Sequence, residues 1–343
     1  MKNEKLTLLL VLKGRHDFSD RWLEYANLYL NDYRILIADG NDQYNKYTLD
    51  KSKYPNLEIE NPEFPYDKNI ECFIRKIKSS LGHIDSEYIL YCENDDLMIS
   101  SEIKNILDFL EKNDEYVSAR GEIFNFSISS INEVYGKIIE FKRFNNFIDL
   151  SESKVFERIN SYSKNKHGLY HNITKKEVFN EMISKVIESK FFDLVIFQYF
   201  WNFFIPISGK IYCSKNIYML HQDHSNMISR NSDIMSFDKS LFYNEDKFKK
   251  FFFVLAKTIS TRYNIEIQEA KFEILNFFSY NELLNIMRDN NKNNYSIKKH
   301  LINLMRKNKF SNFALNYKKR KNFDFNSENF SNLKFIQNFL LKK

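Results

Sequence analysis

The chain has 343 residues, of which 43% are hydrophobic, 28% are charged, 7 are glycine and 4 are proline. This composition supports a packed core, excludes a wholly disordered or collagen-like chain and argues against a turn-rich all-β protein. The net charge of +6 is too small to indicate a nucleic-acid partner, and we expect none.

Three buried strands are predicted in the first hundred residues. Leu6–Leu12, Tyr33–Ala38 and Glu87–Cys92 are almost continuously apolar, a pattern typical of parallel strands buried on both faces. Apolar residues recur at helical spacing between and after these strands, over 18–30, 69–81 and 100–112. The alternation predicts an α/β fold with a Rossmann-like, mostly parallel sheet flanked by helices.

Polar residues follow each predicted strand. They are Lys13-Gly14-Arg15 after the first, Asp39-Gly40 after the second, and Glu93-Asn94-Asp95-Asp96 after the third. Ligands of open α/β sheets bind outside the carboxyl ends of the strands. We therefore expect cations, a lone carboxylate and an acidic cluster to meet in one crevice.

The acidic cluster predicts a metal site. Glu93, Asp95 and Asp96 are the candidate ligands, because carboxylates on alternate residues can share Mg²⁺ or Mn²⁺, which would in turn hold a diphosphate. His221, in the segment His221–Ser225, could add an imidazole to the same ion. The alternatives are that the cluster caps the helix that follows it and that the histidine is an ordinary surface residue.

The other strand-end residues are candidates for nucleotide binding. Lys13 and Arg15 could offset phosphate charge, and Gly14 permits close approach of the backbone. A solvated loop is the alternative for these residues. Asp39 could accept from a pyrimidine N–H or a ribose hydroxyl, and an Asp-Gly turn is its alternative. The full candidate set is Lys13, Gly14, Arg15, Asp39, Gly40, Arg75 and Asn94.

Asp193 is the candidate catalytic residue. It lies between large apolar residues at the start of the helix predicted over 192–204. A partly buried carboxylate there could act as a general base. A helix N-cap is the alternative, and Glu188 competes for the same role.

The alternation of strands and helices weakens after about residue 120. Further strands are expected in 138–144, 169–173, 210–213 and 217–220, and a further helix in 175–188. From about residue 235 the chain is rich in lysine and asparagine and is predicted to be mostly helical. We predict a main domain over 1–232 and a helical, basic C-terminal appendage over 233–343. Its basic runs, Lys318–Lys321 and Lys342–Lys343, are expected to be solvated or to contact an anionic membrane.

The spacing of the cysteines and the length of the apolar runs indicate the cellular compartment of the protein. Cys72, Cys92 and Cys213 form no CxxC pair, which excludes a disulfide scaffold and a thiolate zinc site and fits a reducing compartment. Leu6–Leu12 is too short to span a membrane and lacks a signal-peptide cleavage site. We expect a soluble cytoplasmic protein, with any membrane contact peripheral and at the inner face.

The order of these features resembles the family-2-like glycosyltransferases of the GT-A fold, in particular a bacterial group. The first strand, Lys13–Arg15 and a helix containing Trp22 fit the start of that pattern. Asp39-Gly40 lies where the nucleotide-binding Asp-Gly motif would be, and Glu93-Asn94-Asp95 lies where the DxD motif would be. The resemblance covers roughly residues 5–230. It continues through Tyr170–Phe179, Phe192–Leu194, Gly209–Tyr212 and His221–Ser225. Two positions depart from the pattern: the DxD motif begins with Glu93, and Phe192 precedes Asp193 where the family commonly has Glu-Asp.

The resemblance implies an inverting transfer from a nucleotide-sugar, with a UDP-sugar favoured, to a hydroxyl of a cell-surface glycan, a lipid-linked oligosaccharide or a glycoprotein. The nucleobase would lie near Asp39, a divalent cation at Glu93 and Asp95 would neutralise the departing diphosphate, and Asp193 would take the acceptor proton. Two alternatives stay open. A sugar-phosphate nucleotidyltransferase would be expected to have a Gly-rich, Arg-containing loop after the first strand, and a non-catalytic interaction protein would bind no nucleotide.

Overall fold

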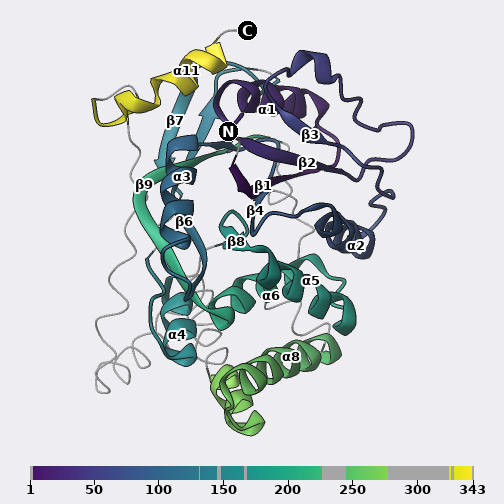
Figure 1. Ribbon diagram of the computed structural model, residues 1–343, viewed down its shortest axis with the longest axis vertical. Helices are drawn as coiled ribbons and strands as arrows, with labels where there is room; N and C mark the ends of the chain where they lie inside the picture. The colour runs from purple at the N-terminus through teal and green to yellow at the C-terminus, as the bar shows by residue number, and fades with distance from the viewer. Residues whose placement is uncertain are drawn as a thin grey trace, which may run out of the picture.

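The computed structural model describes residues 3–130, 132–144, 148–165, 168–225, 245–276, 324–325 and 328–341. Its centre is a nine-stranded sheet in the order β3-β2-β1-β4-β8-β6-β9-β5, with β7 paired to β6 (Figure 1). Helices cover both faces of this sheet. This is the α/β architecture that the sequence predicts, with a sheet that is parallel in its first half and contains antiparallel pairs in its second.

The first half of the sheet is parallel. It consists of β1 (Asn3–Leu12), β2 (Tyr33–Asp39), β3 (Glu58–Glu60) and β4 (Tyr88–Cys92). β1 is central and pairs in parallel with both β2 and β4. The three predicted strands are therefore confirmed. They are β1, β2 and β4, the strands that the candidate polar residues follow in the sequence.

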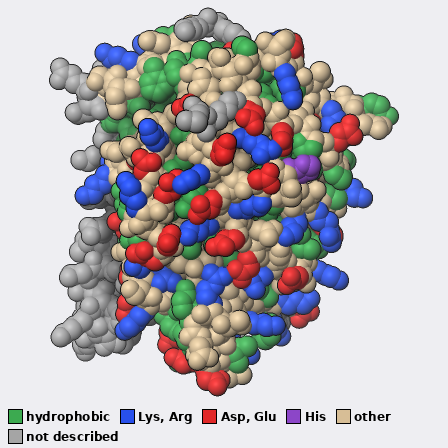
Figure 2. Space-filling view, viewed as in Figure 1, with side chains coloured by type: hydrophobic (Ala, Val, Ile, Leu, Met, Phe, Trp, Pro, Cys, Tyr) green, Lys and Arg blue, Asp and Glu red, His purple; other side chains and the backbone are tan. Residues whose placement is uncertain are grey.

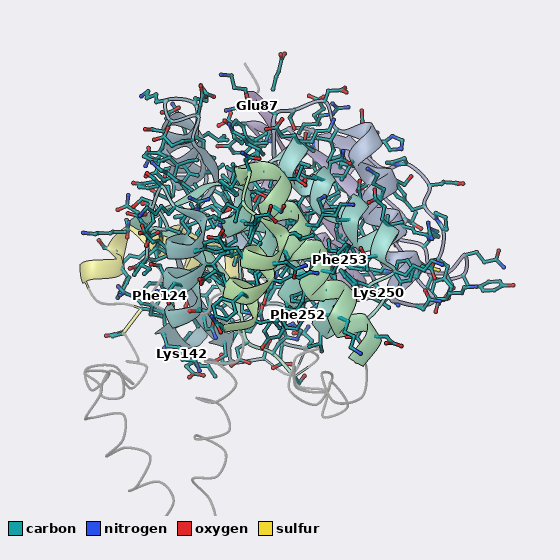
Figure 3. All side chains as sticks on the ribbon, turned by 90° about the horizontal axis from the view of Figure 1, so that it is seen from below. Glu87, Phe124, Lys142, Lys250, Phe252 and Phe253 are labelled. Carbon is teal, nitrogen blue, oxygen red and sulfur yellow. The ribbon has the colours of Figure 1, made fainter. Side chains whose placement is uncertain are left out.

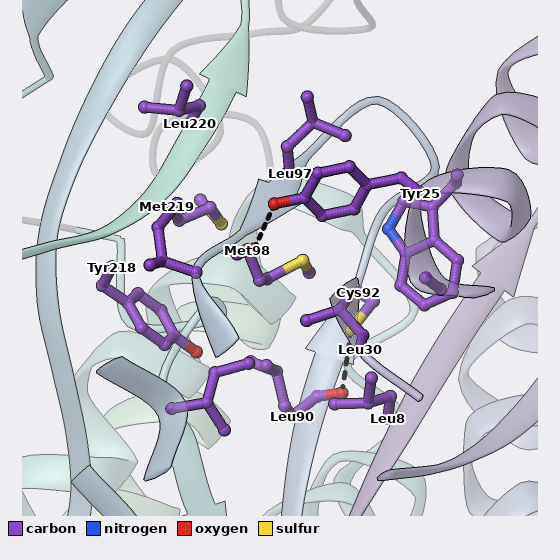
Figure 4. Packing of buried hydrophobic residues seen from close by; sticks show 14 of the residues in the cluster. Leu8, Tyr25, Leu30, Leu90, Cys92, Leu97, Met98, Tyr218, Met219 and Leu220 are labelled. Carbon is purple, nitrogen blue, oxygen red and sulfur yellow. Dashed lines mark hydrogen bonds between the residues drawn. The ribbon is translucent and has the colours of Figure 1, made fainter. Parts of the chain in front are cut away.

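Two hydrophobic clusters lie on opposite faces of the sheet. Leu8 of β1 belongs to one cluster and Leu9 to the other, because successive side chains of a strand point to opposite faces. Figure 4 shows part of the first cluster, where the Tyr25 hydroxyl donates to the Met98 carbonyl oxygen at 2.7 Å. Burial on both faces explains why these strands have no polar alternation in the sequence.

Helices α1 (His16–Tyr29) and α3 (Ser100–Leu110) contribute to the first cluster. Helices α2 (Ile70–Ser80), α4 (Val155–Asn165), α5 (Lys176–Ser189) and α6 (Leu194–Ser208) contribute to the second. Short 3₁₀ turns lie at η1 (Lys51–Lys53) and η2 (Leu81–His83). α2 begins at an Asn69 cap, whose side chain accepts from the Cys72 backbone N–H at 2.9 Å.

The second half of the sheet is mixed. It contains β5 (Leu97–Met98), β6 (Tyr116–Ile128), β7 (Ile138–Arg143), β8 (Ile173–Lys175) and β9 (Lys210–Gln222). β8 is antiparallel to both β4 and β6, whereas β9 runs parallel to β6. Two strand predictions need correction. The strand expected over 169–173 begins only at Ile173, and the two expected over 210–220 form the single strand β9.

Gly121 permits the close pairing of β6 with the middle of β9. A Cβ atom at this position would lie 2.6 Å from the Asn216 carbonyl oxygen. The register shifts between Arg120 and Glu122 at the same place. A local irregularity therefore lets β9 continue as one long strand toward the acidic cluster.

The described parts of the C-terminal region pack at two separate places. α8 (Glu245–Tyr263) packs on α5 and α6, and Figure 3 shows Phe252 and Phe253 on this helix. η5 (Glu328–Leu333) and α11 (Lys334–Leu341) join the first cluster instead. In α11, Phe339 packs on Tyr25 with the ring centroids 5.3 Å apart. Figure 1 shows α8 and α11 at opposite ends of the molecule.

The remaining part of the predicted appendage, including residues 233–244, 277–323 and 342–343, lies outside the described residues. The basic runs Lys318–Lys321 and Lys342–Lys343 fall there. No helix within the described ranges is both long and apolar enough to span a membrane. Acidic and basic side chains are interspersed over the face shown in Figure 2, as the mild net charge suggests.

Candidate active site

The ends of the first three parallel strands meet at one edge of the sheet. The register pairs Leu10 of β1 with Cys92 of β4, and Leu12 of β1 with Asp39 of β2. The residues that follow these strands must therefore emerge side by side, as the sequence predicts.

Asp95 is the most highly engaged carboxylate of the acidic cluster. Its Oδ2 accepts from Arg15 Nη1 at 2.6 Å and lies 2.8 Å from His224 Nε2. Burial favours protonation of Asp95, but the hydrogen bond with His224 and the charge of Arg15 outweigh it and hold the pKa of this carboxyl well below its usual range. Asp95 is therefore ionised at neutral pH, and it brings β1, β4 and the segment after β9 together.

Asp96 contacts two histidines. Its Oδ1 lies 2.7 Å from His221 Nδ1, and its Oδ2 lies 3.6 Å from His171 Nδ1. The strand pairing explains both neighbours. β5 pairs with β9 through Leu97 and Leu220, which places the preceding Asp96 beside His221. The antiparallel pairing of β8 with β4 leads the chain before Ile173 along the end of β4.

The two histidines differ in their state of protonation. Burial opposes protonation of His221, but the charge of Asp96 and its hydrogen bond outweigh burial and raise the pKa of His221 to about 9. Burial prevails at His171 and lowers its pKa to about 4, although the charge of Asp96 opposes this change. At neutral pH His171 is therefore neutral and carries a lone pair, whereas His221 carries a proton that Asp96 shares.

Glu93 completes the acidic cluster. Burial, together with the charges of Asp95 and Asp96, raises the pKa of Glu93 to about 8. Within the described residues the Glu93 side chain makes no hydrogen bond or ion pair. A cation is the kind of partner that would stabilise three carboxylates so close together.

The acidic cluster is suited to a divalent cation because it has a buried carboxylate oxygen without a hydrogen-bond partner. Ligand atoms of Glu93, Asp95 and Asp96 lie within 4.8 Å of one another. Asp95 Oδ1 is buried and has no hydrogen-bond partner. Unpaired buried carboxylate oxygens are costly, and oxygen ligands of this kind suit Mg²⁺ or Mn²⁺.

Asp39 lies at the neighbouring strand end, but its carboxylate is already engaged. Oδ1 accepts from the backbone N–H and the side-chain amide of Asn41, and Oδ2 accepts from the Tyr47 N–H at 2.8 Å. Asn41 Oδ1 in turn accepts from the Gly14 N–H at 2.5 Å. The alternative of an Asp-centred turn thus describes the bonding here, and the turn links the ends of β1 and β2.

Gly40 covers a buried ion pair. Lys76 Nζ lies 2.6 Å from Asp67 Oδ2, and both side chains are fully buried. A Cβ atom on Gly40 would lie 2.0 Å from that same carboxylate oxygen. Lys13 Nζ donates to the Asp67 carbonyl oxygen at 2.5 Å. Gly40 and Lys13 therefore hold the segment around Asp67 against the sheet edge.

Two expected binding residues have structural partners. Arg75 is 55% exposed and pairs with Glu71 on its own helix at 2.8 Å. The neighbouring Lys76, which the sequence analysis did not select, is the residue that α2 directs toward the ends of β1 and β2. Asn94 donates through its amide to the Arg15 carbonyl oxygen at 3.1 Å and to Ser19 Oγ at 2.9 Å, and so supports the start of α1.

Asp193 is the N-cap of α6. Its Oδ1 accepts from the backbone N–H groups of Val195 and Ile196, at 3.0 and 3.1 Å. Its Oδ2 makes no hydrogen bond within the described residues. Arg75 lies on this side of the molecule, with its Cζ 5.6 Å from the centre of the Phe192 ring. Glu188, the competing candidate, is exposed near the end of α5.

Sequence reasoning missed His171. The signal that could have found it is the polar pair His171-Asn172, which interrupts an otherwise apolar stretch from Leu169 to Ile173. His224 was part of the segment predicted from the sequence, although its partner Asp95 could not be inferred.

Comparison with known proteins gives little sequence similarity. A scan against models of protein families and a search of curated proteins find no match. Among solved structures, S. aureus TarS is similar at 10% identity and a TM-score of 0.47, over 80% of this chain and 43% of that one. S. aureus TarS 1–349 in complex with UDP-GlcNAc has 10% identity and a TM-score of 0.48, over 80% and 71% of the two chains. The chain thus spans less than half of the longer TarS structure. At this level of likeness the interpretation of the site rests on its own side chains.

Proposed function

We propose that this chain is a glycosyltransferase, which moves a sugar from a nucleotide-sugar donor to an acceptor hydroxyl with inversion. The observation that carries this proposal is the meeting of Glu93, Asp95 and Asp96 with Arg15 at the carboxyl edge of the parallel strands. That edge is where open α/β sheets bind nucleotide ligands. A cluster of carboxylates without enough internal partners suits a cation that would bind a diphosphate.

Each residue has a role in this proposal. Glu93 and Asp95 Oδ1 would hold a divalent cation, which when bound supplies a Lewis acid for the departing nucleoside diphosphate. Arg15 fixes Asp95 and, being 28% exposed, remains near enough to solvent to meet a phosphate oxygen. Asp39 and Gly14 shape the adjoining turn for the nucleoside. The Asp193 Oδ2 would take the proton of the acceptor hydroxyl as that hydroxyl attacks the anomeric carbon.

The donor and acceptor classes follow from the sequence resemblance rather than from a side-chain contact. That resemblance favours a UDP-sugar as donor and a cell-surface glycan, lipid-linked oligosaccharide or glycoprotein as acceptor. Peripheral contact with an anionic membrane through the basic C-terminal region belongs to the same proposal. The loop after β1 has only one glycine, and its Arg15 is engaged by Asp95, which disfavours a sugar-phosphate nucleotidyltransferase.

A binding panel tests the proposal. The full chain is mixed with UDP-, GDP-, CMP- or TDP-sugars, with and without Mn²⁺, and its melting temperature is measured, because a ligand that binds the folded state raises it. We expect one nucleotide class to raise the melting temperature in the presence of Mn²⁺, and Asp95→Asn to abolish this shift. Asp85→Asn is the matched control, because Asp85 is 90% exposed before the same strand. No shift with any nucleotide would instead support a non-catalytic interaction protein.

A further inference from the structure

Asp96, His171 and His221 form a second group of possible metal ligands beside Glu93 and Asp95. They come from three elements that are distant in the sequence: the turn after β4, the segment before β8, and β9. Their exposed fractions are 0%, 5% and 8%. One ligand atom from each of the three side chains lies within 4.8 Å of the others. The sheet register therefore gathers two imidazoles and one carboxylate in a place that water scarcely reaches.

Two atoms of this cluster have no hydrogen-bond partner. They are Asp96 Oδ2 and His171 Nδ1, both buried, and they face each other at 3.6 Å. Leaving a buried donor or acceptor unpaired costs roughly 1–3 kcal/mol. Two ligands about 2.1 Å from a tetrahedral zinc ion lie about 3.4 Å apart. The observed separation is thus close to that of two ligands sharing one ion.

We propose that Asp96, His171 and His221 bind one divalent transition-metal ion, with Zn²⁺ preferred over Mn²⁺ and Mg²⁺. Imidazole nitrogen suits Zn²⁺, whereas Mg²⁺ takes oxygen ligands in octahedral geometry. The order Mn²⁺ below Zn²⁺ also follows the general affinity series of divalent metals. The ion would take the place of the proton that His221 Nδ1 and Asp96 Oδ1 share at 2.7 Å. This inference goes beyond the proposed function, because it concerns metal binding by the chain without any nucleotide.

The competing interpretation is a purely structural one. Asp96 and His221 would form a buried hydrogen-bonded pair, with His171 as a neutral neighbour that fills space. That interpretation predicts no stoichiometric metal binding in the absence of nucleotide. It also predicts that replacing His171 changes stability alone.

Metal titration of the full chain separates the two interpretations. The protein is freed of metal with a chelator, incubated separately with Zn²⁺, Mn²⁺ or Mg²⁺, and passed over a desalting column, after which the retained metal is measured by mass spectrometry. We expect one Zn²⁺ per chain, less Mn²⁺ and no retained Mg²⁺. Co²⁺ is added in a parallel experiment, because its absorption spectrum reports nitrogen ligands directly. Less than about 0.2 Zn²⁺ per chain would overturn the proposal.

Variants assign the ligands. His171→Asn and His221→Asn should each weaken Zn²⁺ binding by more than about tenfold, since even an outer-shell partner is commonly worth that much. Glu93→Gln and the exposed-histidine control His83→Asn should retain one Zn²⁺. Circular dichroism checks that each variant is folded, and His171→Gln replaces His171→Asn if the latter is not. Equal Zn²⁺ retention by the folded His171 variant and the wild type would overturn the assignment. Because no nucleotide is present, failure here leaves the donor-binding experiment unaffected.

Discussion

Arg15 Nη1 lies 2.6 Å from Asp95 Oδ2, across 80 residues of sequence. Arg15 immediately precedes α1 and has a positive φ of 57°, so the chain turns sharply after β1. The guanidinium thereby reaches across to the turn after β4. This ion pair and the hydrogen bond from the Asn94 amide to the Arg15 carbonyl oxygen join the two strand ends on which the candidate active site depends.

Replacing Arg15 tests how much this contact contributes. Arg15→Met leaves the buried Asp95 carboxylate with fewer partners, and we expect it to lower the free energy of unfolding by about 1–3 kcal/mol. Arg34→Met is the matched control. Arg34 is 26% exposed, similar to Arg15, but its partners Glu58 and Glu60 are themselves exposed, so its loss should cost less than about 1 kcal/mol. Urea unfolding measures both, and equal losses would show that Asp95 does not depend on Arg15.

The buried pair Asp67–Lys76 gives a larger expected effect. Lys76→Met leaves the Asp67 carboxylate buried without its counterion, which typically costs about 3–5 kcal/mol. The double variant Asp67→Asn/Lys76→Met removes both charges and should recover much of that loss. Arg75→Met, on the adjacent and exposed position of the same helix, should change the free energy of unfolding by less than about 0.5 kcal/mol. A double variant as unstable as Lys76→Met alone would contradict this account.

The raised pKa values of two cysteine thiols predict which cysteine a thiol reagent labels at pH 8. Burial raises the pKa of Cys213 to about 12, although the charge of Arg120 opposes this change. Burial also raises the pKa of Cys92 well above its usual value. Because the thiolate is the reactive form, a raised pKa leaves little of either residue reactive at pH 8. We expect iodoacetamide to label the native chain only at Cys72, and Cys72→Ser to abolish the labelling. Rapid labelling of Cys213 in the folded Cys72→Ser variant at pH 8 would contradict the predicted shift.

The parallel half of the sheet was predictable because its strands are buried on both faces. A strand buried on both faces has to be apolar throughout, as Leu6–Leu12 is. The polar residues that follow it then have to lie where the strand ends, at the edge of the sheet. The meeting of Arg15 with Asp95 follows from the same logic. Strand order predicted that both residues reach one crevice, but the sequence suggested a phosphate partner for Arg15 and a metal ion for Asp95, not each other.

Other features depend on pairings that no local pattern encodes. His171 meets Asp96 only because β8 runs antiparallel to β4, and a short strand of three residues gives little periodic signal. Lys76 is buried because Asp67 pairs with it. The helical pattern gave no reason to prefer it to Arg75, because a charged residue beside an apolar stripe is normally solvated.

Asp193 can be tested as a base without losing its role as a helix cap. Ser and Asp cap helices about equally well, so Asp193→Ser should retain the hydrogen bonds to Val195 and Ile196 and unfold within about 1 kcal/mol of the wild type. A serine hydroxyl cannot take the acceptor proton, because it lacks the basic carboxylate oxygen. We therefore expect donor binding to persist while transfer to simple alkyl glycosides falls by about 10²–10⁴-fold.

Two further variants make this test specific to the base role of Asp193. Asp193→Ala removes the cap as well and should lose about 1 kcal/mol of unfolding free energy in addition to activity. Asn69→Ser exchanges one capping residue for another at the start of α2, and it should alter neither stability nor transfer appreciably. The decisive readout is the rate of nucleoside diphosphate release with acceptor present, compared with the donor-induced rise in melting temperature. If Asp193→Ser transfers sugar at the wild-type rate, Asp193 is a structural cap alone and the base must be another group.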